Sequence, residues 1–285
     1  MVIAISGSSG FVGKHLTEFF SAKGDTVVAL RHSYFRNISD EKLRKTLYGC
    51  DVVINLAGVT INQRWTPAAK RKIMESRIEA TRRLVSIMNA MTVKPSLFIS
   101  ASAVGIYPSS GIYNENSIAE GTTFLADVCR HWEEEAQKVS ADVRLAITRF
   151  GVILASDGGA LPKMLLPFRL YAGGKIASGK QGFSWIHIED VRQAMRFVIE
   201  HPELSGIINF VSPQPITNEA FTKAAAAALR RPAWLTVPAF MLHWLYGEGE
   251  VLMTEGQQAC PARLLSAGYV FFYSDIRVAL QSLVV

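Results

Sequence analysis

Apolar runs of about five residues alternate with helical patterns through the first 150 residues of the chain. The runs Val-Val-Ile-Asn-Leu and Leu-Phe-Ile-Ser are continuously apolar rather than alternating, which is typical of strands buried on both faces of a parallel sheet. The pattern predicts strands at 2–6, 26–31, 51–56, 96–101 and 143–149, and helices at 11–22, 40–48, 67–91 and 122–140. Thr66 and Pro67 suit the N-cap and first turn of the third helix. This order predicts an α/β fold of the Rossmann type, with helices on both faces of a doubly wound parallel sheet.

Beyond residue 150 the pattern becomes irregular and rich in glycine. A strand at 207–211 is expected to rejoin the sheet, and short helices are expected at 217–230, 238–246 and 261–267. We therefore expect a Rossmann domain over 1–150, with 185–211 rejoining it. Residues 151–184 and 212–285 would form a smaller, carboxy-terminal substrate-binding cap.

A G-x-x-G-x-x-G turn follows the first predicted strand and opens the first predicted helix. Gly7 allows a sharp turn, Gly10 allows the backbone to approach a pyrophosphate, and Gly13 allows the helix to pack on the strand. The helix would direct the free N–H groups of its first turn at the phosphates. The turn predicts a dinucleotide site whose residues are Gly7, Ser9, Gly10, Phe11, Val12 and Gly13.

The residue that ends the second strand bears on the choice of cofactor. An acidic side chain there would accept a hydrogen bond from a ribose 2′-OH, whereas a cation would neutralise a 2′-phosphate. This chain has Arg31 followed by His32, and Asp25 precedes the strand in a turn. Arg31 could instead be an ordinary exposed arginine. The sequence favours NADP(H) over NAD(H).

The 285 residues carry 30 Lys and Arg against 24 Asp and Glu, a net charge of +6. The densest basic stretch, around residues 70–83, is interleaved with Glu75 and Glu79, so a nucleic-acid partner is not expected. Cys50, Cys129 and Cys260 have no metal-ligand or disulfide spacing, and no metal is expected. No apolar run approaches the length of a membrane span, and no membrane partner is expected. A cytoplasmic protein follows as the expectation.

Several separated motifs resemble the extended short-chain dehydrogenase/reductase superfamily, within the NAD-dependent epimerase/dehydratase group. The resemblance is closest to its atypical epimerase-like, or cell-division-inhibitor-like, branch, and it spans nearly the whole chain. The motifs are Asn-Leu-Ala-Gly at 55–58, Arg-Trp-Thr at 64–66, Ser-Arg at 76–77, Ser-Ala-Ser-Ala-Val-Gly at 100–105, Arg-Phe-Gly-Val-Ile-Leu at 149–154, Asp-Gly-Gly at 157–159, Leu-Pro-Phe-Arg at 166–169, Ser-Gly-Lys-Gln at 178–181, Trp-Ile-His-Ile-Glu-Asp at 185–190 and Gly-Tyr at 268–269.

The resemblance implies further cofactor contacts along the carboxyl ends of the strands. The residues concerned are Leu56, Ala57, Gly58, Arg77, Ser100, Ala101 and Gly151. Arg77 could reach the cofactor phosphates from its helix, or form a salt bridge on the helix surface.

Members of the superfamily use a Ser or Thr that polarises the substrate oxygen and a Tyr-x-x-x-Lys pair that exchanges a proton. By resemblance, Ser102 occupies the place of the polarising hydroxyl, while Leu125 and Cys129 stand where the Tyr and Lys belong. Tyr107, or Tyr113, in the following loop could replace the lost phenol, although a loop tyrosine without a nearby cation is more often a packing residue. Acidic neighbours would raise the pKa of the Cys129 thiol, which we expect to be inert.

A substrate contact is expected from the cap, which should close over the nicotinamide end. Arg169, Lys180 and Gln181 could recognise an anionic group, and Trp185 lies in the same region. His187 is expected to have a structural role. Around this pocket the sequence departs from the pattern of the branch at Val59, Ile106, Pro108, Lys175 and Ala177. The resemblance therefore does not assign a substrate.

The sequence leaves two main functions open. One is an NADP(H)-dependent oxidoreductase or epimerase-like enzyme with a small polar, sugar- or nucleotide-linked substrate. The other is a non-catalytic regulator that responds to NADP(H), with a connection to cell division suggested by the name of the branch. A third option is an interaction protein with a vestigial cofactor site.

A homodimer through the helices at 67–91 and 122–140 is the default expectation for assembly.

Overall fold

A central six-stranded sheet organises the molecule in a computed structural model that describes residues 1–36, 38–118 and 120–284. Its strand order is β11-β6-β4-β3-β1-β2 and every neighbouring pair is parallel. The strands are β1 (Val2–Ser6), β2 (Thr26–Leu30), β3 (Val52–Asn55), β4 (Leu97–Ala103), β6 (Arg144–Phe150) and β11 (Gly206–Phe210). The predicted doubly wound α/β fold is confirmed, and the strand expected at 207–211 is β11.

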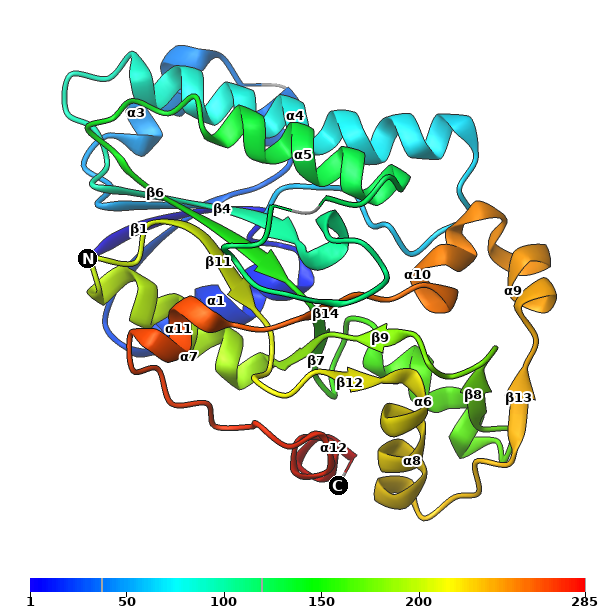
Figure 1. Cartoon of the computed structure of the whole chain (residues 1–285). Coiled ribbons are helices and arrows are strands. Elements are labelled where there is room, and N and C mark those ends of the chain that lie inside the picture. Colours follow the sequence, from blue (N-terminus) through cyan, green and yellow to red (C-terminus); the bar gives the residue numbers. More distant parts are fainter. Residues whose placement is uncertain (37, 119, 285) are drawn as a thin grey trace.

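Helices cover both faces of this sheet (Figure 1). One face carries α1 (Phe11–Ala22) and α7 (Ile188–Glu200), and the other carries α3 (Asp40–Leu47), α4 (Pro67–Asn89) and α5 (Phe124–Ala136). Two apolar clusters fill the layers, one around Leu16, Phe20 and Val191, the other around Leu43, Leu84 and Phe98. The predicted cap of α4 is confirmed, since Thr66 accepts a hydrogen bond from the Ala69 N–H and Pro67 is the first helical residue.

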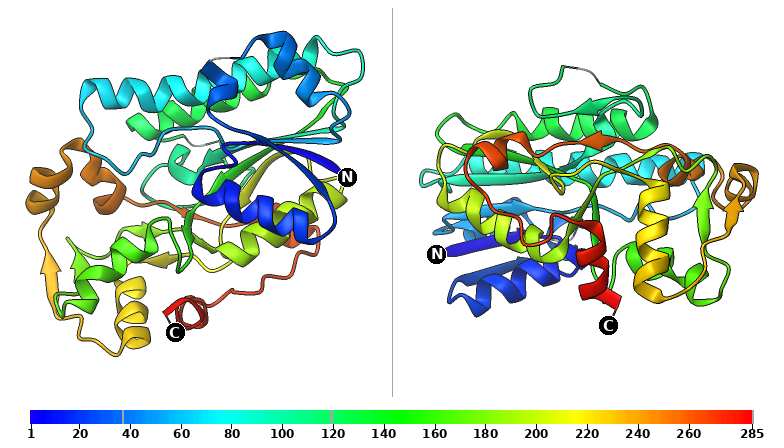
Figure 2. Two further views of the ribbon diagram at one scale, coloured as in Figure 1. Left: turned by 180° about the vertical axis from the view of Figure 1, so that it is seen from behind. Right: turned by 60° about the horizontal axis from the view of Figure 1, so that its bottom comes forward.

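A second layer of short elements lies beyond the carboxyl ends of the strands (Figure 2). Four two-stranded pairings hold it: β7 (Val152–Leu154) with β10 (Trp185–His187), β8 (Gly174–Ile176) with β13 (Leu235–Val237), β9 (Gly182–Phe183) with β12 (Ile216–Thr217), and β5 (Ile112–Tyr113) with β14 (Gln258–Ala259). Its helices include α6 (Leu161–Arg169), α8 (Asn218–Leu229), α9 (Ala239–Tyr246), α10 (Val251–Thr254) and α12 (Ile276–Val284), whereas α11 (Ala262–Ser266) packs against β11 of the central sheet. The short elements α2 (Ser33–Arg36), η1 (Val104–Ile106) and η2 (Glu248–Glu250) complete the chain.

Three helices of at least nine residues, α6, α7 and α12, are absent from the elements predicted by sequence. Pro162 and Pro167 obscured α6, because Pro167 lies inside the helix and Pro normally interrupts a helical pattern. The apolar spacing Val191, Ala194, Met195, Val198 was a signal for α7 that could have been used. None of the helices in the described residues has both the length and the apolar composition that crossing a bilayer requires.

Candidate cofactor and active site

The glycine turn lies at the point where the strand order reverses, between β1 and β3. In open α/β sheets, ligands bind outside the carboxyl ends of the strands at such a point. Gly7 has φ +70°, and a Cβ there would lie 2.8 Å from the Leu56 carbonyl oxygen. A Cβ on Gly13 would lie 2.2 Å from the Gly7 carbonyl oxygen. These two positions require glycine for conformation and for close packing respectively.

Gly10 serves a different purpose. It is the N-cap of α1, it is exposed, and no side chain caps the helix. A Cβ there would meet only the Gly7 oxygen, at 3.1 Å, and would otherwise project into open space. The first-turn N–H groups of Phe11, Val12 and Gly13 are therefore free of side-chain caps at the positive end of the helix dipole. This cradle suits an anionic diphosphate, and exposed Ser9 lies at its rim.

A buried chain of hydrogen bonds shapes the loop at residues 56–58, which faces the glycine turn. Ser6 Oγ donates to Asn55 Oδ1 at 2.6 Å and accepts from the Leu56 N–H at 3.1 Å. Asn55 Nδ2 donates to Thr81 Oγ1, which also accepts from Trp132 Nε1. Strands β1 and β3 are thereby tied to helices α4 and α5 directly below the cradle.

Arg77 packs against this loop rather than forming a surface ion pair. Its guanidinium donates to the carbonyls of Val59 and Ile73, and it lies 5.2 Å from the Trp132 ring. A Cβ on Gly58 would lie 3.0 Å from the Arg77 guanidinium carbon, so a larger residue at 58 would have to displace the Arg77 side chain. Burial lowers the pKa of Arg77 from its ordinary value. Among the two sequence-based alternatives for Arg77, the surface salt bridge is wrong, and the cofactor contact stays a prediction.

Arg31 and His32 are exposed immediately after β2, next to the strand that leads into the glycine turn. Asp25, before the strand, accepts from the amino terminus at 3.0 Å and pairs with Arg196 of α7 at 2.6 Å. Asp25 is therefore part of a structural ion cluster, and no carboxylate follows β2 directly.

Ser102 belongs to a buried ionic network at the carboxyl end of β4. Its hydroxyl donates to Glu133 Oε1 at 2.6 Å, and Glu133 forms a two-point ion pair with Arg149 at 2.7 and 2.8 Å. Because the only hydroxyl hydrogen is given to a carboxylate, Ser102 can accept from a substrate hydroxyl but is not set to polarise a carbonyl.

Tyr107 lies at the far side of the same network. Arg149 donates to the Tyr107 oxygen at 2.9 Å, and that oxygen also lies 3.1 Å from Asn209 Oδ1 and from the Asn114 carbonyl. The expectation of a tyrosine without a nearby cation is wrong, because the Arg149 guanidinium is bonded to it. However, Tyr107 is 1% exposed, and burial raises its pKa despite that cation. The phenol is held in the core in this structure rather than poised in a mobile loop.

Neither position of the missing proton-transfer pair carries a group that ionises near neutral pH. Leu125 packs near Gly105, in an apolar cluster with Val59, Trp65 and Leu252 of α10. Cys129 is buried, and burial together with the Glu133 charge raises the pKa of its thiol to about 11. The predicted direction of the pKa shift of Cys129 is confirmed, and Glu133 is the acidic neighbour responsible.

The other predicted cofactor residues lie on neighbouring strand ends. Ser100 and Ala101 of β4 are buried, and Ser100 Oγ has no hydrogen-bond partner among the described residues. A Cβ on Gly151 would lie 2.7 Å from the Ser184 carbonyl oxygen, so the crossing of two backbones already accounts for that glycine.

The predicted substrate residues do not share one environment. Arg169 and Lys180 are exposed, on the last turn of α6 and in the loop between β8 and β9. Gln181 Nε2 donates to the carbonyls of Ile176 and Met253, so it joins β8 to α10. Trp185 is 1% exposed in the cap core with Phe168 and Phe221. None of these contacts tests a substrate role.

The expected structural role of His187 agrees with its contacts. Its Nδ1 accepts from the Glu189 N–H at 3.0 Å and caps α7, while the ring stacks on Tyr273 with centroids 3.8 Å apart. Its Nε2 lies 3.3 Å from Ser282 Oγ of α12. Burial lowers the pKa of His187 to about 4.

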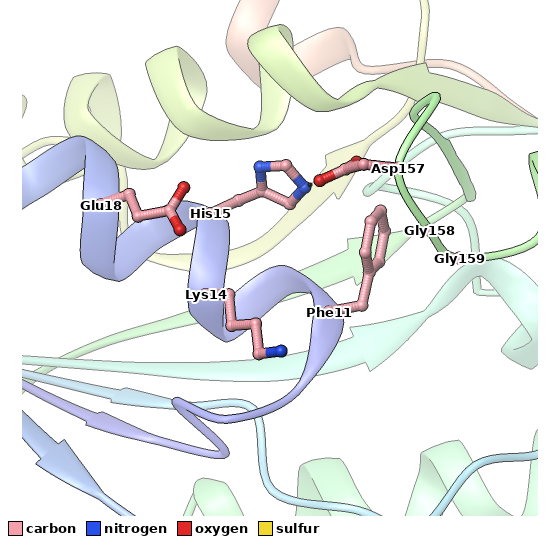
Figure 3. Close-up of a pocket in the computed structure, with 7 residues that line it drawn as sticks. All are labelled: Phe11, Lys14, His15, Glu18, Asp157, Gly158 and Gly159. Carbon is pink, nitrogen blue, oxygen red and sulfur yellow. Dashed lines mark hydrogen bonds and ion pairs between the residues drawn. The ribbon is translucent and has the colours of Figure 1, made fainter.

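A pocket of about 320 Å³ lies beside the first turn of α1 (Figure 3). The Phe11 ring faces Gly158 and Gly159, where any Cβ would approach it within 3 Å, and His15 Nε2 lies 3.2 Å from Asp157. The loop at 157–159 therefore packs directly on α1. Sequence reasoning missed this contact, which spans more than 140 residues of chain.

Sequence reasoning also missed Glu133, Asn209 and the ionic role of Arg149. Arg149 stands inside a motif that carried the resemblance, but its pairing with Glu133, 16 residues away, was not recognised. Within the described residues, no group of three His, Cys, Asp or Glu is arranged to hold a metal ion.

The fold and the glycine cradle define a nucleotide-binding protein of the Rossmann class. The sequence model of the NAD dependent epimerase/dehydratase family matches residues 3–210, and a domain of unknown function (DUF1731) matches residues 237–283. The chain belongs to the NAD dependent epimerase/dehydratase family, in the epimerase-like branch of the short-chain dehydrogenase/reductase superfamily.

Close relatives cover the whole chain. It is 38% identical to the epimerase family protein YfhF of Bacillus subtilis, over 100% of this chain and 98% of that protein. It is 36% identical to the chloroplastic epimerase family protein SDR39U1 homolog of Arabidopsis thaliana, over 99% of this chain and 86% of that one. The human epimerase family protein SDR39U1, solved with NADPH, superimposes with a TM-score of 0.92 at 31% identity, covering 100% of this chain and 99% of that one.

Proposed function

We propose that this protein binds NADP(H) in the glycine cradle between β1 and β3. The observation that carries the proposal is the pairing of an uncapped α1 N-terminus with a cation, Arg31, and no carboxylate after β2. The NADPH in the human relative supports the same choice. Gly10, Phe11 and Val12 would receive the diphosphate, and Arg31 the 2′-phosphate.

The experiment is calorimetric titration of NADPH and NADH on protein stripped of nucleotide. Arg31→Ala should weaken NADPH binding by about 1.5–3 kcal/mol, roughly 10- to 150-fold, because a charge-assisted hydrogen bond is lost. It should leave NADH binding unchanged. Arg71→Ala, at an exposed arginine of α4, is the matched control. Equal losses for both nucleotides would contradict the assignment of Arg31 to the 2′-phosphate.

For the reaction, we propose an oxidoreductase or epimerase-like activity on a small polar, sugar- or nucleotide-linked substrate. The bound nucleotide would supply hydride transfer. Ser102 would accept a hydrogen bond from a substrate hydroxyl, since its own hydrogen is held by Glu133. Ser102 would therefore orient the alcohol form of the substrate. The proton of that alcohol would be exchanged with water or with another group of the substrate. Ser102→Ala should reduce hydride exchange without changing NADPH affinity.

A non-catalytic regulator is the second candidate. The observation in its favour is that Ser102 and Tyr107 are both held in the buried network around Glu133 and Arg149. That network continues through Asn209 to the Cys260 carbonyl, within the segment matched by the domain of unknown function. This candidate predicts NADPH binding without turnover and a partner whose affinity depends on NADPH. The names of the relatives give no support to a connection with cell division, and the cytoplasmic location stays a prediction.

A further inference from the structure

One end of the cap exposes an unusual concentration of large apolar side chains. Eight of the seventeen exposed large hydrophobic residues in the described chain lie in two short segments, 161–171 and 230–244. They are Leu166, Leu170, Tyr171, Trp234, Leu235, Phe240, Met241 and Trp244. Trp234, Phe240 and Trp244 are each more than 70% exposed. Exposed apolar patches of this kind mark interaction sites.

The two parts of the chain approach each other where residues 171–176 lie beside residues 231–237. Strand β13 pairs with β8, and the Leu235 N–H donates to the Gly173 carbonyl oxygen. The Arg231 guanidinium carbon lies 4.4 Å from the centre of the Tyr171 ring. Both views of the molecule place β13 and α9 at the end opposite the amino terminus (Figures 1 and 2). We call residues 161–181 and 230–244 the cap tip.

The cap tip is also strongly basic. It contains Lys163, Arg169, Lys175, Lys180, Arg230 and Arg231, and it contains no Asp or Glu. These six cations equal the net charge of the whole chain, which is +6. The nearby carboxylates already have partners. Glu219 of α8 is paired with Lys223 at 2.9 Å, Glu248 is paired with Lys70 of α4, and Glu250 lies 3.2 Å from His243. The surroundings of the apolar side chains therefore favour an anionic partner.

This charge argues against a second copy as the partner. An isologous dimer through the cap tip would bring two sets of six cations together, and like charges destabilise an interface. A nucleic acid would match the charge but would leave aliphatic side chains such as Leu170 and Met241 without an apolar partner. The interface of a bilayer with anionic lipids satisfies both features, because tryptophan and aliphatic side chains enter the headgroup region while arginine and lysine meet the phosphates.

We propose that the cap tip binds the surface of a membrane that contains anionic lipids. The sequence-based expectation of no membrane partner rested on the lack of a spanning segment, and binding at the surface needs no such segment. Trp234, Phe240 and Trp244 would enter the interface, and Arg169 and Arg231 would contact lipid phosphates. This proposal does not rest on nucleotide binding, since the residues that carry it are not those of the glycine turn.

The structure supplies a direct spectroscopic test. Of the five tryptophans, Trp65, Trp132 and Trp185 are buried, while Trp234 and Trp244 are exposed on the cap tip. Titration with vesicles of phosphatidylcholine and phosphatidylglycerol (7:3) should shift the fluorescence emission to shorter wavelength and carry the protein down on sedimentation. Pure phosphatidylcholine vesicles should bind at least about fivefold more weakly, since each basic residue near an anionic surface contributes a factor of that size.

Matched variants locate the binding surface. Phe240→Ser should reduce affinity for the anionic vesicles at least about tenfold, whereas Phe272→Ser, at an exposed phenylalanine outside the cap tip, should leave it unchanged. Arg169→Ala should cost about fivefold, with Arg71→Ala as its control. All four positions are exposed or lie outside the core, and unchanged thermal midpoints verify folding.

Several results would overturn the proposal. They are no binding to anionic vesicles, equal binding to neutral vesicles, or an equal loss in Phe272→Ser and Phe240→Ser. A concentration-dependent dimer that Phe240→Ser dissociates, without vesicle binding, would assign the cap tip to a second copy. The same emission shift with poly-glutamate instead of vesicles would assign it to an acidic protein partner.

Discussion

Gly10 and Gly13 differ in their surroundings, although both are glycine positions of the same sequence motif. Gly13 is required by the protein itself, because a Cβ would collide with the Gly7 carbonyl at 2.2 Å. Gly10 is not required by the packing of the protein itself, because a Cβ there would meet one atom at 3.1 Å and otherwise open space. This difference between Gly10 and Gly13 depends on the distance between neighbouring backbone segments, which the spacing of glycines in the sequence does not reveal.

The two glycines should therefore separate stability from binding. Gly13→Ala should lower the free energy of unfolding by about 1–3 kcal/mol through overpacking and weaken NADPH binding as well. Gly10→Ala should change stability by less than about 1 kcal/mol, yet reduce NADPH affinity, because the added methyl occupies the approach of the diphosphate. Urea denaturation and calorimetry on both variants check this. A Gly10→Ala protein with full NADPH affinity would count against the cradle as the diphosphate site.

At the scale of elements, the buried pair Glu133–Arg149 joins α5 to β6, and through Ser102 to β4. Both side chains are about 95% buried. Burying such a pair costs desolvation free energy, so the pair adds little net stability. Its effect is to fix the positions of Ser102 and Tyr107.

The outer faces of α4 and α5 carry none of the exposed large apolar residues in the described chain. A homodimer through those helices stays a prediction, and its contacts would be polar.

Removing the charge of Glu133 should destabilise the fold strongly. Glu133→Gln keeps the shape but leaves the Arg149 guanidinium buried without a counter-charge, which should cost about 3–5 kcal/mol. Glu134→Gln, the exposed neighbour on α5, should change stability by less than about 0.5 kcal/mol. Urea denaturation of both variants measures the difference. A loss below 1 kcal/mol for Glu133→Gln would mean that water reaches the pair.

At the scale of the whole molecule, the segment Trp185–Asp190 holds the carboxy-terminal chain against the sheet. Asp190 accepts hydrogen bonds from the N–H groups of Phe272 and Tyr273 and from the Tyr269 hydroxyl. His187 stacks on Tyr273 and meets Ser282. These residues connect α7 to the last 20 residues, so their ionisation affects the cooperative unfolding of the molecule.

His187 should make the protein sensitive to acid. The pKa of His187 is about 4 in the folded protein, against an ordinary value of 6.5 that applies to the unfolded chain. Between pH 6.5 and pH 4 the unfolded chain therefore binds one more proton than the folded protein, and the free energy of unfolding falls as the pH falls. The loss should total about 3 kcal/mol between pH 6.5 and 4. His187→Asn, which can still cap α7, should flatten this part of the stability profile, whereas His131→Asn at an exposed position should not. Thermal midpoints across this range measure both profiles, and parallel profiles for His187→Asn and the parent would show that His187 is not the group that titrates.

The sequence by itself determined the features that depend on neighbours along the chain. The order of the main strands and helices up to residue 150, the cap Thr66, the glycine turn and the place of Arg31 after a strand follow from local periodicity and backbone sterics, which act over a few residues. The tertiary structure decided whatever depends on contacts between distant residues. Arg149 reaches Tyr107 across 42 residues and His15 reaches Asp157 across 142, and only folding brings these side chains together. The exposed apolar side chains of the cap tip likewise emerged only from the structure, in which β8 pairs with β13, because exposure is a property of packing rather than of composition.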